Sequence, residues 1–129
     1  MKVHHLAISV KNSEKSVKFY KDNFGFEEIK RFTKPGWDGG AVVLELDDLQ
    51  LEIFQFNNYI EKKDDLSDLK AIGLKHIGIQ VANVNEKYRE FKNKQIDIDE
   101  PVKGVTVPWF CFLRDPDGIP IELYESKIQ

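Results

Sequence analysis

The chain has 129 residues, of which 41% are hydrophobic and 32% charged, and it carries a formal net charge of −3. This composition is typical of one globular domain, and the absence of a basic stripe argues against nucleic-acid binding. The single cysteine, Cys111, excludes an internal disulfide and suits a reducing compartment. No apolar run reaches the ~18 residues of a membrane-spanning helix, and the start of the chain lacks the apolar core of a signal peptide. We therefore expect a soluble, cytoplasmic protein without nucleic-acid or membrane partners.

The sequence repeats itself at an offset of 71 residues, from His5 to His76. Residues 5–12 and 76–83 each alternate between aliphatic and other side chains, which predicts a half-buried strand. Each stretch ends on an asparagine, Asn12 or Asn83, a residue that favours the start of a helix, and a helical pattern follows. Further strands are predicted over residues 28–33, 40–47, 49–56, 97–99, 109–114 and 119–125.

We interpret this pattern as a duplication that produces two tandem βαβββ modules within a single domain, residues 1–129. Module one comprises residues 1–56 and module two residues 74–129, and residues 57–73 form the linker. The polar segment 61–70 within the linker is predicted to form a short surface helix. The fold class is then α+β, with both modules in one curved, mostly antiparallel sheet around a concavity and the helices on the outer face.

One face of four predicted strands carries residues that could bind a metal. Side chains alternate between the two faces of a strand. In each of these strands one face is aliphatic, and the other face carries a single His5, Glu52, His76 or Glu122. Two imidazoles and two carboxylates suit a first-row divalent metal and leave positions open for water or substrate. The alternative is a solvated sheet face on which the four are merely exposed. His4 has the opposite parity to His5 or stands at the strand end, and we interpret it as structural rather than as the ligand.

Aromatic residues accompany these candidate ligands. Phe54 and Tyr124 alternate with Glu52 and Glu122 and are candidates for the wall of an apolar substrate pocket. Further candidates for this wall are Trp37, Trp109 and Phe110. The alternative is that all of them belong to an ordinary core or interface.

Several segments match one known family: the opening strand 5–10 with the helix end and turn over 19–26, the strand segment 51–53, and the segment 74–81. The strongest match is the closing segment Asp-Pro-Asp-Gly-Ile-Pro-Ile-Glu-Leu over residues 115–123. With these the chain resembles, over essentially its whole length, the vicinal oxygen chelate superfamily. That group includes glyoxalase I, methylmalonyl-CoA epimerase, extradiol dioxygenases, and fosfomycin- and bleomycin-resistance proteins. The positions of its metal ligands fall on His5, Glu52, His76 and Glu122.

The resemblance implies a lyase or isomerase closest to glyoxalase I. A Ni, Co, Zn, Mn or Fe ion would hold a small α-oxo compound or its thiol adduct, and the proton would move through a metal-bound enediolate. Glu122 is the candidate base and Glu52 the second candidate. Ser9 and Phe56 stand where bacterial glyoxalase I often has Arg and Asn to hold glutathione, so the thiol carrier is left open. The alternatives are a binding module for an antibiotic or other small molecule, or dioxygenase, epimerase or thiol-transferase chemistry.

The assembly is also open at this point, because each module supplies only half of the ligand set. Members of this group place the complete site either within one chain or across a homodimer. We expect a homodimer. Because the long connection between Glu52 and His76 allows module two to fold back, we favour a site within one chain.

Overall fold

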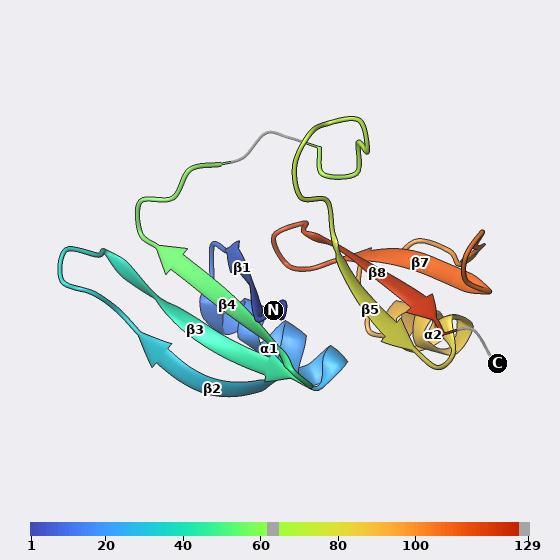
Figure 1. The fold of residues 1–129 in the computed structure, drawn as a ribbon, viewed down its shortest axis with the longest axis horizontal. Coiled ribbons are helices and arrows are strands. Elements are labelled where there is room, and N and C mark those ends of the chain that lie inside the picture. The colour runs from blue at the N-terminus through green and yellow to red at the C-terminus, as the bar shows by residue number, and fades with distance from the viewer. Residues whose placement is uncertain (62–64, 127–129) are drawn as a thin grey trace. The chain divides into compact units, whose positions relative to one another are not determined.

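A computed structural model describes residues 1–61 and 65–126 (Figure 1). It divides into two compact units, residues 1–62 and 63–129, and each is described here by itself. Module one contains β1 (His5–Ser9), α1 (Ser13–Phe24), β2 (Glu27–Phe32), β3 (Gly39–Leu46) and β4 (Leu49–Phe56). Module two contains β5 (Ile77–Val81), α2 (Val84–Asn93), β6 (Val102–Lys103), β7 (Trp109–Arg114) and β8 (Pro120–Glu125). The predicted α+β fold of two βαβββ modules is confirmed. None of the described helices is long and apolar enough to cross a membrane.

Strand pairing is the same in both modules. The described strands form two four-stranded sheets, in the orders β1-β4-β3-β2 and β5-β8-β7-β6, where the sequence predicted a single one. In each sheet the first and last strands of the module run parallel, and the other neighbours run antiparallel. The last strand therefore lies between the first and third strands, in the interior of its sheet.

The repeated asparagines begin both helices, as predicted. The side chain of Asn12 accepts a hydrogen bond from the backbone N–H of Lys15 at 3.1 Å, and that of Asn83 accepts one from Glu86 at 2.9 Å. These bonds satisfy N–H groups that have no partner within the helix. α1 ends at Gly25, whose φ of +81° lies in the left-handed region that glycine adopts without strain.

Each helix packs on the aliphatic face of its own sheet. The buried side chains of module one on this side include Val17, Tyr20, Val42, Leu44, Leu51 and Ile53. Their counterparts in module two include Val84, Phe91, Cys111, Leu113, Ile121 and Leu123. Because strand side chains alternate, this packing assigns the odd residues of β4 and β8 to the core and turns Glu52 and Glu122 to the opposite face.

The turn before β8 sets the pairing of β7 with β8. One carboxylate oxygen of Asp115 accepts hydrogen bonds from the backbone N–H groups of Asp117 and Ile119, both at 2.9 Å. Gly118 has a φ of +81°, which a side chain would strain. The turn therefore requires this local sequence, and it places Phe112 directly opposite Glu122.

Two expected elements are wrong. Residues 65–70 form turns instead of the predicted surface helix, and residues 62–64 of that prediction lie outside the described residues. The side chains of Asp65 and Asp68 accept hydrogen bonds from backbone N–H groups two residues later, which competes with helix formation. In place of a strand over 97–99 there is one isolated bridge between Ile98 and Leu113. Pro101 has no N–H to continue that ladder, and the short β6 follows it.

Candidate metal and substrate site

In module one, His5 and Glu52 lie on the same face of neighbouring strands. β1 and β4 pair in parallel with Ala7 beside Glu52, so His5 is displaced from Glu52 by one two-residue step. The Nε2 atom of His5 lies 3.9 Å from Oε2 of Glu52, and the side chains are 47% and 22% exposed. The imidazole of His5 is thus partly exposed to solvent, and the carboxylate of Glu52 lies near it.

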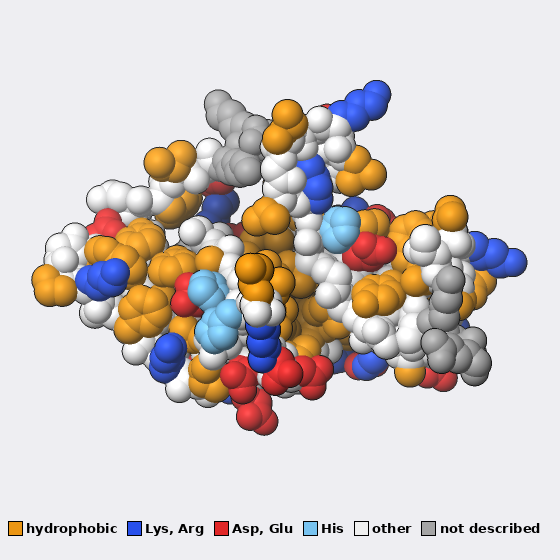
Figure 2. Space-filling model, viewed as in Figure 1, with side chains coloured by type: hydrophobic (Ala, Val, Ile, Leu, Met, Phe, Trp, Pro, Cys, Tyr) orange, Lys and Arg blue, Asp and Glu red, His pale blue; other side chains and the backbone are white. Residues whose placement is uncertain are grey.

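Module two repeats this diagonal arrangement. β5 and β8 pair with Gly78 beside Glu122, and His76 stands two residues before Gly78. The Nε2 atom of His76 lies 2.9 Å from Oε2 of Glu122. Figure 2 shows histidine side chains beside acidic ones in each module. The two pairs are equivalent because both modules have the same strand register. The sequence repeat indicated this equivalence, and the strand pairing defines it.

His4 lies at the end of β1, one of the two places that the sequence allowed for it. Its Nδ1 atom is 2.9 Å from Nδ1 of His5, and the two rings meet edge to face. β1 begins at His5, so His4 lies just before the strand, where its side chain contacts the ring of His5. Both rings are exposed.

The chemistry and spacing of these donors fit a divalent cation. Adjacent ligands of a six-coordinate ion with bonds of about 2.1 Å stand about 3.0 Å apart. The 2.9 Å between His76 and Glu122 matches this spacing, whereas the 3.9 Å between His5 and Glu52 requires a side-chain rotation. Within the described ranges no group of three or more His, Cys, Asp or Glu residues converges on one point. Each module thus supplies two donors by itself.

An aromatic cluster follows Glu52 along β4 in module one. Phe54, two residues after Glu52, belongs to an aromatic cluster that consists of Phe32, Trp37, Phe54 and Phe56. Ring centroids of neighbouring members are 5.1 to 6.4 Å apart. All four are only half-buried. The structure therefore brings Trp37 and Phe54 into one cluster and adds Phe32 and Phe56.

The predicted aromatic residues of module two divide between the two faces of its sheet. Tyr124 pairs with Phe110 on the face of Glu122, and its hydroxyl lies 3.4 Å from the side-chain oxygen of Gln80. Trp109 alternates with Phe110 and so lies on the opposite face, where Lys103 stands over its ring. Its expected place in the pocket wall is not supported by this register.

Phe112 is a residue of the site that the sequence argument missed. It lies opposite Glu122, and its ring meets that of His76 edge to face with 5.1 Å between centroids. Counting alternate residues back from Glu122 through the turn 115–119 could have found it, because that turn fixes the register.

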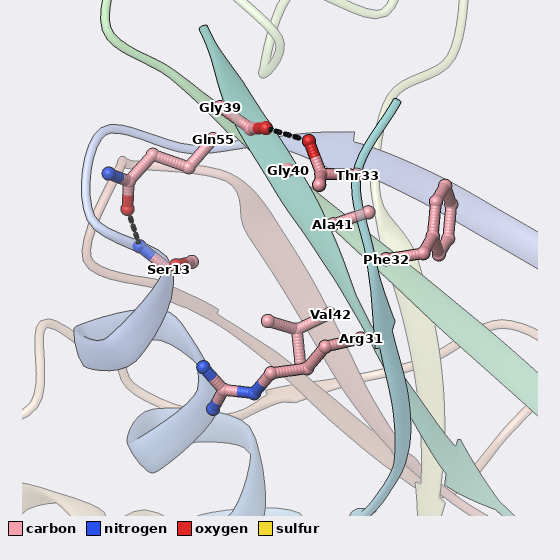
Figure 3. A pocket seen from close by; sticks show the side chains of 9 residues that line it. All are labelled: Ser13, Arg31, Phe32, Thr33, Gly39, Gly40, Ala41, Val42 and Gln55. Carbon is pink, nitrogen blue, oxygen red and sulfur yellow. Dashed lines mark hydrogen bonds between the residues drawn. The ribbon is translucent and has the colours of Figure 1, made fainter. Parts of the chain in front are cut away.

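An open cleft of about 410 Å³ lies elsewhere in module one (Figure 3). It is lined by Ser13, Arg31, Phe32, Thr33, Gly39, Gly40, Ala41, Val42 and Gln55. The side chain of Gln55 accepts a hydrogen bond from the backbone N–H of Ser13 at 2.6 Å. The guanidinium of Arg31 pairs with the carboxylates of Glu14 and Glu28. The cleft contains none of the four candidate ligands, and its cation is already neutralised.

Comparison with known proteins identifies the family. The model of the Glyoxalase/Bleomycin resistance protein/Dioxygenase superfamily matches residues 2–123. The uncharacterized protein YwkD of Bacillus subtilis is 31% identical, over 96% of both chains. Human mitochondrial methylmalonyl-CoA epimerase is 27% identical, over 97% of this chain and 74% of that protein. The structure of the trypanothione-dependent glyoxalase I of Leishmania major is similar, with a TM-score of 0.76 and 26% identity over 97% of this chain and 86% of that one.

A more distant structure shares the fold and contains a metal. A mutant of the fosfomycin resistance protein FosX from Listeria monocytogenes, solved with Mn(II) and a dihydroxypropylphosphonic acid, has a TM-score of 0.73 and 18% identity over 98% of this chain and 94% of that one. At least one protein of this fold thus binds a divalent metal. Sequence, module order and structure agree that the chain belongs to the Glyoxalase/Bleomycin resistance protein/Dioxygenase superfamily.

Proposed function

We propose that the protein is a metal-dependent lyase or isomerase of the glyoxalase I type. It would move a proton beside the carbonyl of a small α-oxo compound or of its thiol adduct. The observation that carries this proposal is the equivalent His–Glu pair of each module, with the histidine two residues before the strand neighbour of the glutamate. The similarity to glyoxalase I of Leishmania major and to human methylmalonyl-CoA epimerase supports it.

The two pairs together would hold one Ni, Co, Zn, Mn or Fe ion through His5, Glu52, His76 and Glu122. The ion would supply the Lewis-acid chemistry that stabilises negative charge on a carbonyl oxygen. With four protein donors, such an ion would still have room to bind the substrate or water. The open side of each pair provides the access that this exchange requires.

Glu122 is the proposed base. Its carboxylate would take the proton from the carbon beside the carbonyl and return it to the former carbonyl carbon. The hydroxyl proton would move from one oxygen to the other, so that the reaction consumes no other reagent. The imidazole of His76 at 2.9 Å and the ring of Phe112 restrict where this carboxylate can lie. The aromatic cluster beside Glu52 would keep water away from the carbanion-like species that exists after the proton is removed and before it is returned.

Epimerisation is the second candidate, favoured by the similarity to the human epimerase. It needs one group to remove a proton from one side of a carbon and another to return a proton to the opposite side. Two carboxylates, Glu52 and Glu122, provide such a pair. In this case both glutamates are essential for proton transfer, whereas isomerisation needs one.

The test begins with metal-free protein, titrated calorimetrically with Ni²⁺, Co²⁺, Zn²⁺ and Mn²⁺. The loaded protein is then assayed with methylglyoxal, alone and with several thiols, and with a chiral α-substituted acyl thioester. We expect one ion per complete site and turnover of one substrate class. A protein that binds none of these ions would refute the proposal, and tight binding of an apolar small molecule by that same protein would favour the binding-module alternative.

A further inference from the structure

The hydrogen bond between His4 and His5 can run in either direction, and its direction decides whether Nε2 of His5 can bind a metal. Their Nδ1 atoms are 2.9 Å apart, which is a hydrogen-bond distance. A neutral imidazole carries one N–H donor and one acceptor nitrogen, so only one of these two Nδ1 atoms is the donor. If His4 donates, the N–H of His5 lies on Nε2, which cannot then bind a metal. If His5 donates, its Nε2 keeps a free lone pair on the side of Glu52.

The geometry around His5 favours the second arrangement. Oε2 of Glu52 is 3.9 Å from Nε2 of His5 and beyond hydrogen-bond range, so no hydrogen bond to Glu52 favours an N–H on Nε2. The backbone carbonyl of His4 accepts the N–H of Gln50 at 3.1 Å, which ties His4 to β4 beside the pair. The hydrogen bond between the rings therefore starts from a fixed backbone position. With Nδ1–H as its donor, Nε2 of His5, which lies 3.9 Å from Glu52, is the nitrogen that can share a cation with that carboxylate.

We propose that His4 is a positioning residue that accepts the Nδ1–H of His5 and so keeps the Nε2 lone pair of His5 directed at the metal position. This inference rests on the proposed function, because it assigns His5 as a ligand. A hydrogen-bond partner on the second nitrogen fixes the tautomer and orientation of a ligating imidazole. The residue before His76 is Lys75, whose side chain has no hydrogen-bond acceptor. The residue before the histidine can therefore accept this hydrogen bond in module one but not in module two.

The first measurement is the tautomer of His5 in the metal-free protein. Long-range proton–nitrogen NMR at a pH of about 8, where an ordinary imidazole is neutral, separates Nδ1–H from Nε2–H. We expect Nδ1–H in the wild type and in His4→Asn, whose amide oxygen can accept the same hydrogen bond. His4→Leu should show a mixture of both forms. The side chain of His4 is exposed, so none of these variants removes core packing.

The second measurement is metal affinity, with Zn²⁺ and Ni²⁺ titrated into the same proteins. Loss of the partner of a ligating histidine costs roughly 10- to 100-fold in metal affinity, and we expect about tenfold for His4→Leu because the contact is exposed. His4→Asn should retain most of the wild-type affinity. Lys75→Ala is the matched control, since it truncates the residue before the other histidine, and it should not weaken binding.

The outcomes separate this inference from the proposed function. A wild-type protein with the Nδ1–H form but no metal binding would overturn the proposed function and the positioning role, while the hydrogen bond itself remained. Metal binding with equal affinity in His4→Leu, or a wild-type His5 in the Nε2–H form, would overturn only the positioning role. A Zn²⁺-induced shift on a ring nitrogen of His4 as large as that on Nε2 of His5 would also overturn it, because His4 would then be a ligand.

Discussion

The Nε2 atom of His76 lies 2.9 Å from a carboxylate oxygen of Glu122, whereas the equivalent atoms of His5 and Glu52 are 3.9 Å apart. Module two therefore holds its two donors at the spacing of adjacent metal ligands, and module one needs a small rotation to reach it. The same strand register produces both pairs, so the difference lies in the side chains. Each pair has a ring neighbour of its own: Phe112 beside His76 and His4 beside His5.

Replacing Glu122 by Gln separates proton transfer from metal binding. The amide oxygen can still bind a cation but cannot accept a proton at neutral pH, so kcat should fall by roughly 10²- to 10⁴-fold. Calorimetry should show that substantial metal binding remains. Glu100→Gln, the same exchange on an exposed segment, should leave both quantities unchanged. Near-normal turnover of Glu122→Gln would move the base to Glu52 or elsewhere.

Mixing two inactive chains tests the assembly that we propose, a homodimer with each site completed within one chain. His5→Ala and His76→Ala should each lose metal, because each removes one imidazole ligand. If the two pairs of one chain form the site, refolding the two variants together should restore neither metal binding nor activity. Recovery would show that one protomer supplies the first pair and its partner the second.

Truncation of a core residue in module two should destabilise the fold. Leu123 is 0% exposed on the helix-covered face of β8. Leu123→Ala removes buried methyl groups and leaves a cavity, so the free energy of unfolding should fall by about 2–5 kcal/mol in a denaturant titration. Leu69 is 76% exposed, and Leu69→Ala should change it by less than about 0.5 kcal/mol. Equal effects would contradict the packing described here.

Cys111 should make stability fall at alkaline pH. Burial, helped by the charge of Asp99, raises the pKa of its thiol from an ordinary 9.0 to about 11. Between these values the unfolded chain releases the proton and the folded chain does not, so rising pH favours unfolding. The stability difference between wild type and Cys111→Ala should be constant below pH 9 and shrink between pH 9 and 11. A difference independent of pH would contradict the raised pKa. Because Cys111 is buried, its thiol should also react slowly with disulfide reagents until the protein unfolds.

Much of the candidate site was predictable from local rules. Alternation along the predicted strands selected His5, Glu52, His76 and Glu122 as candidates, because successive strand side chains point to opposite faces. In the structure β5 begins at Ile77, so His76 lies one residue before it. Asn12 and Asn83 marked the starts of both helices because their side chains satisfy backbone N–H groups a few residues away. Such features depend on interactions within a short stretch of chain.

What the sequence could not determine depends on residues distant along the chain. The place of Phe112 opposite Glu122 and the opposite face of Trp109 follow from the register of β7, which the Asp115 turn and cross-strand pairing set together. The contact of His4 with His5 depends on where β1 begins, and that depends on its pairing with β4. Strand alternation thus determined which residues share a face. Tertiary structure decided which of them touch, because register and the ends of strands are set by hydrogen bonds between separate segments.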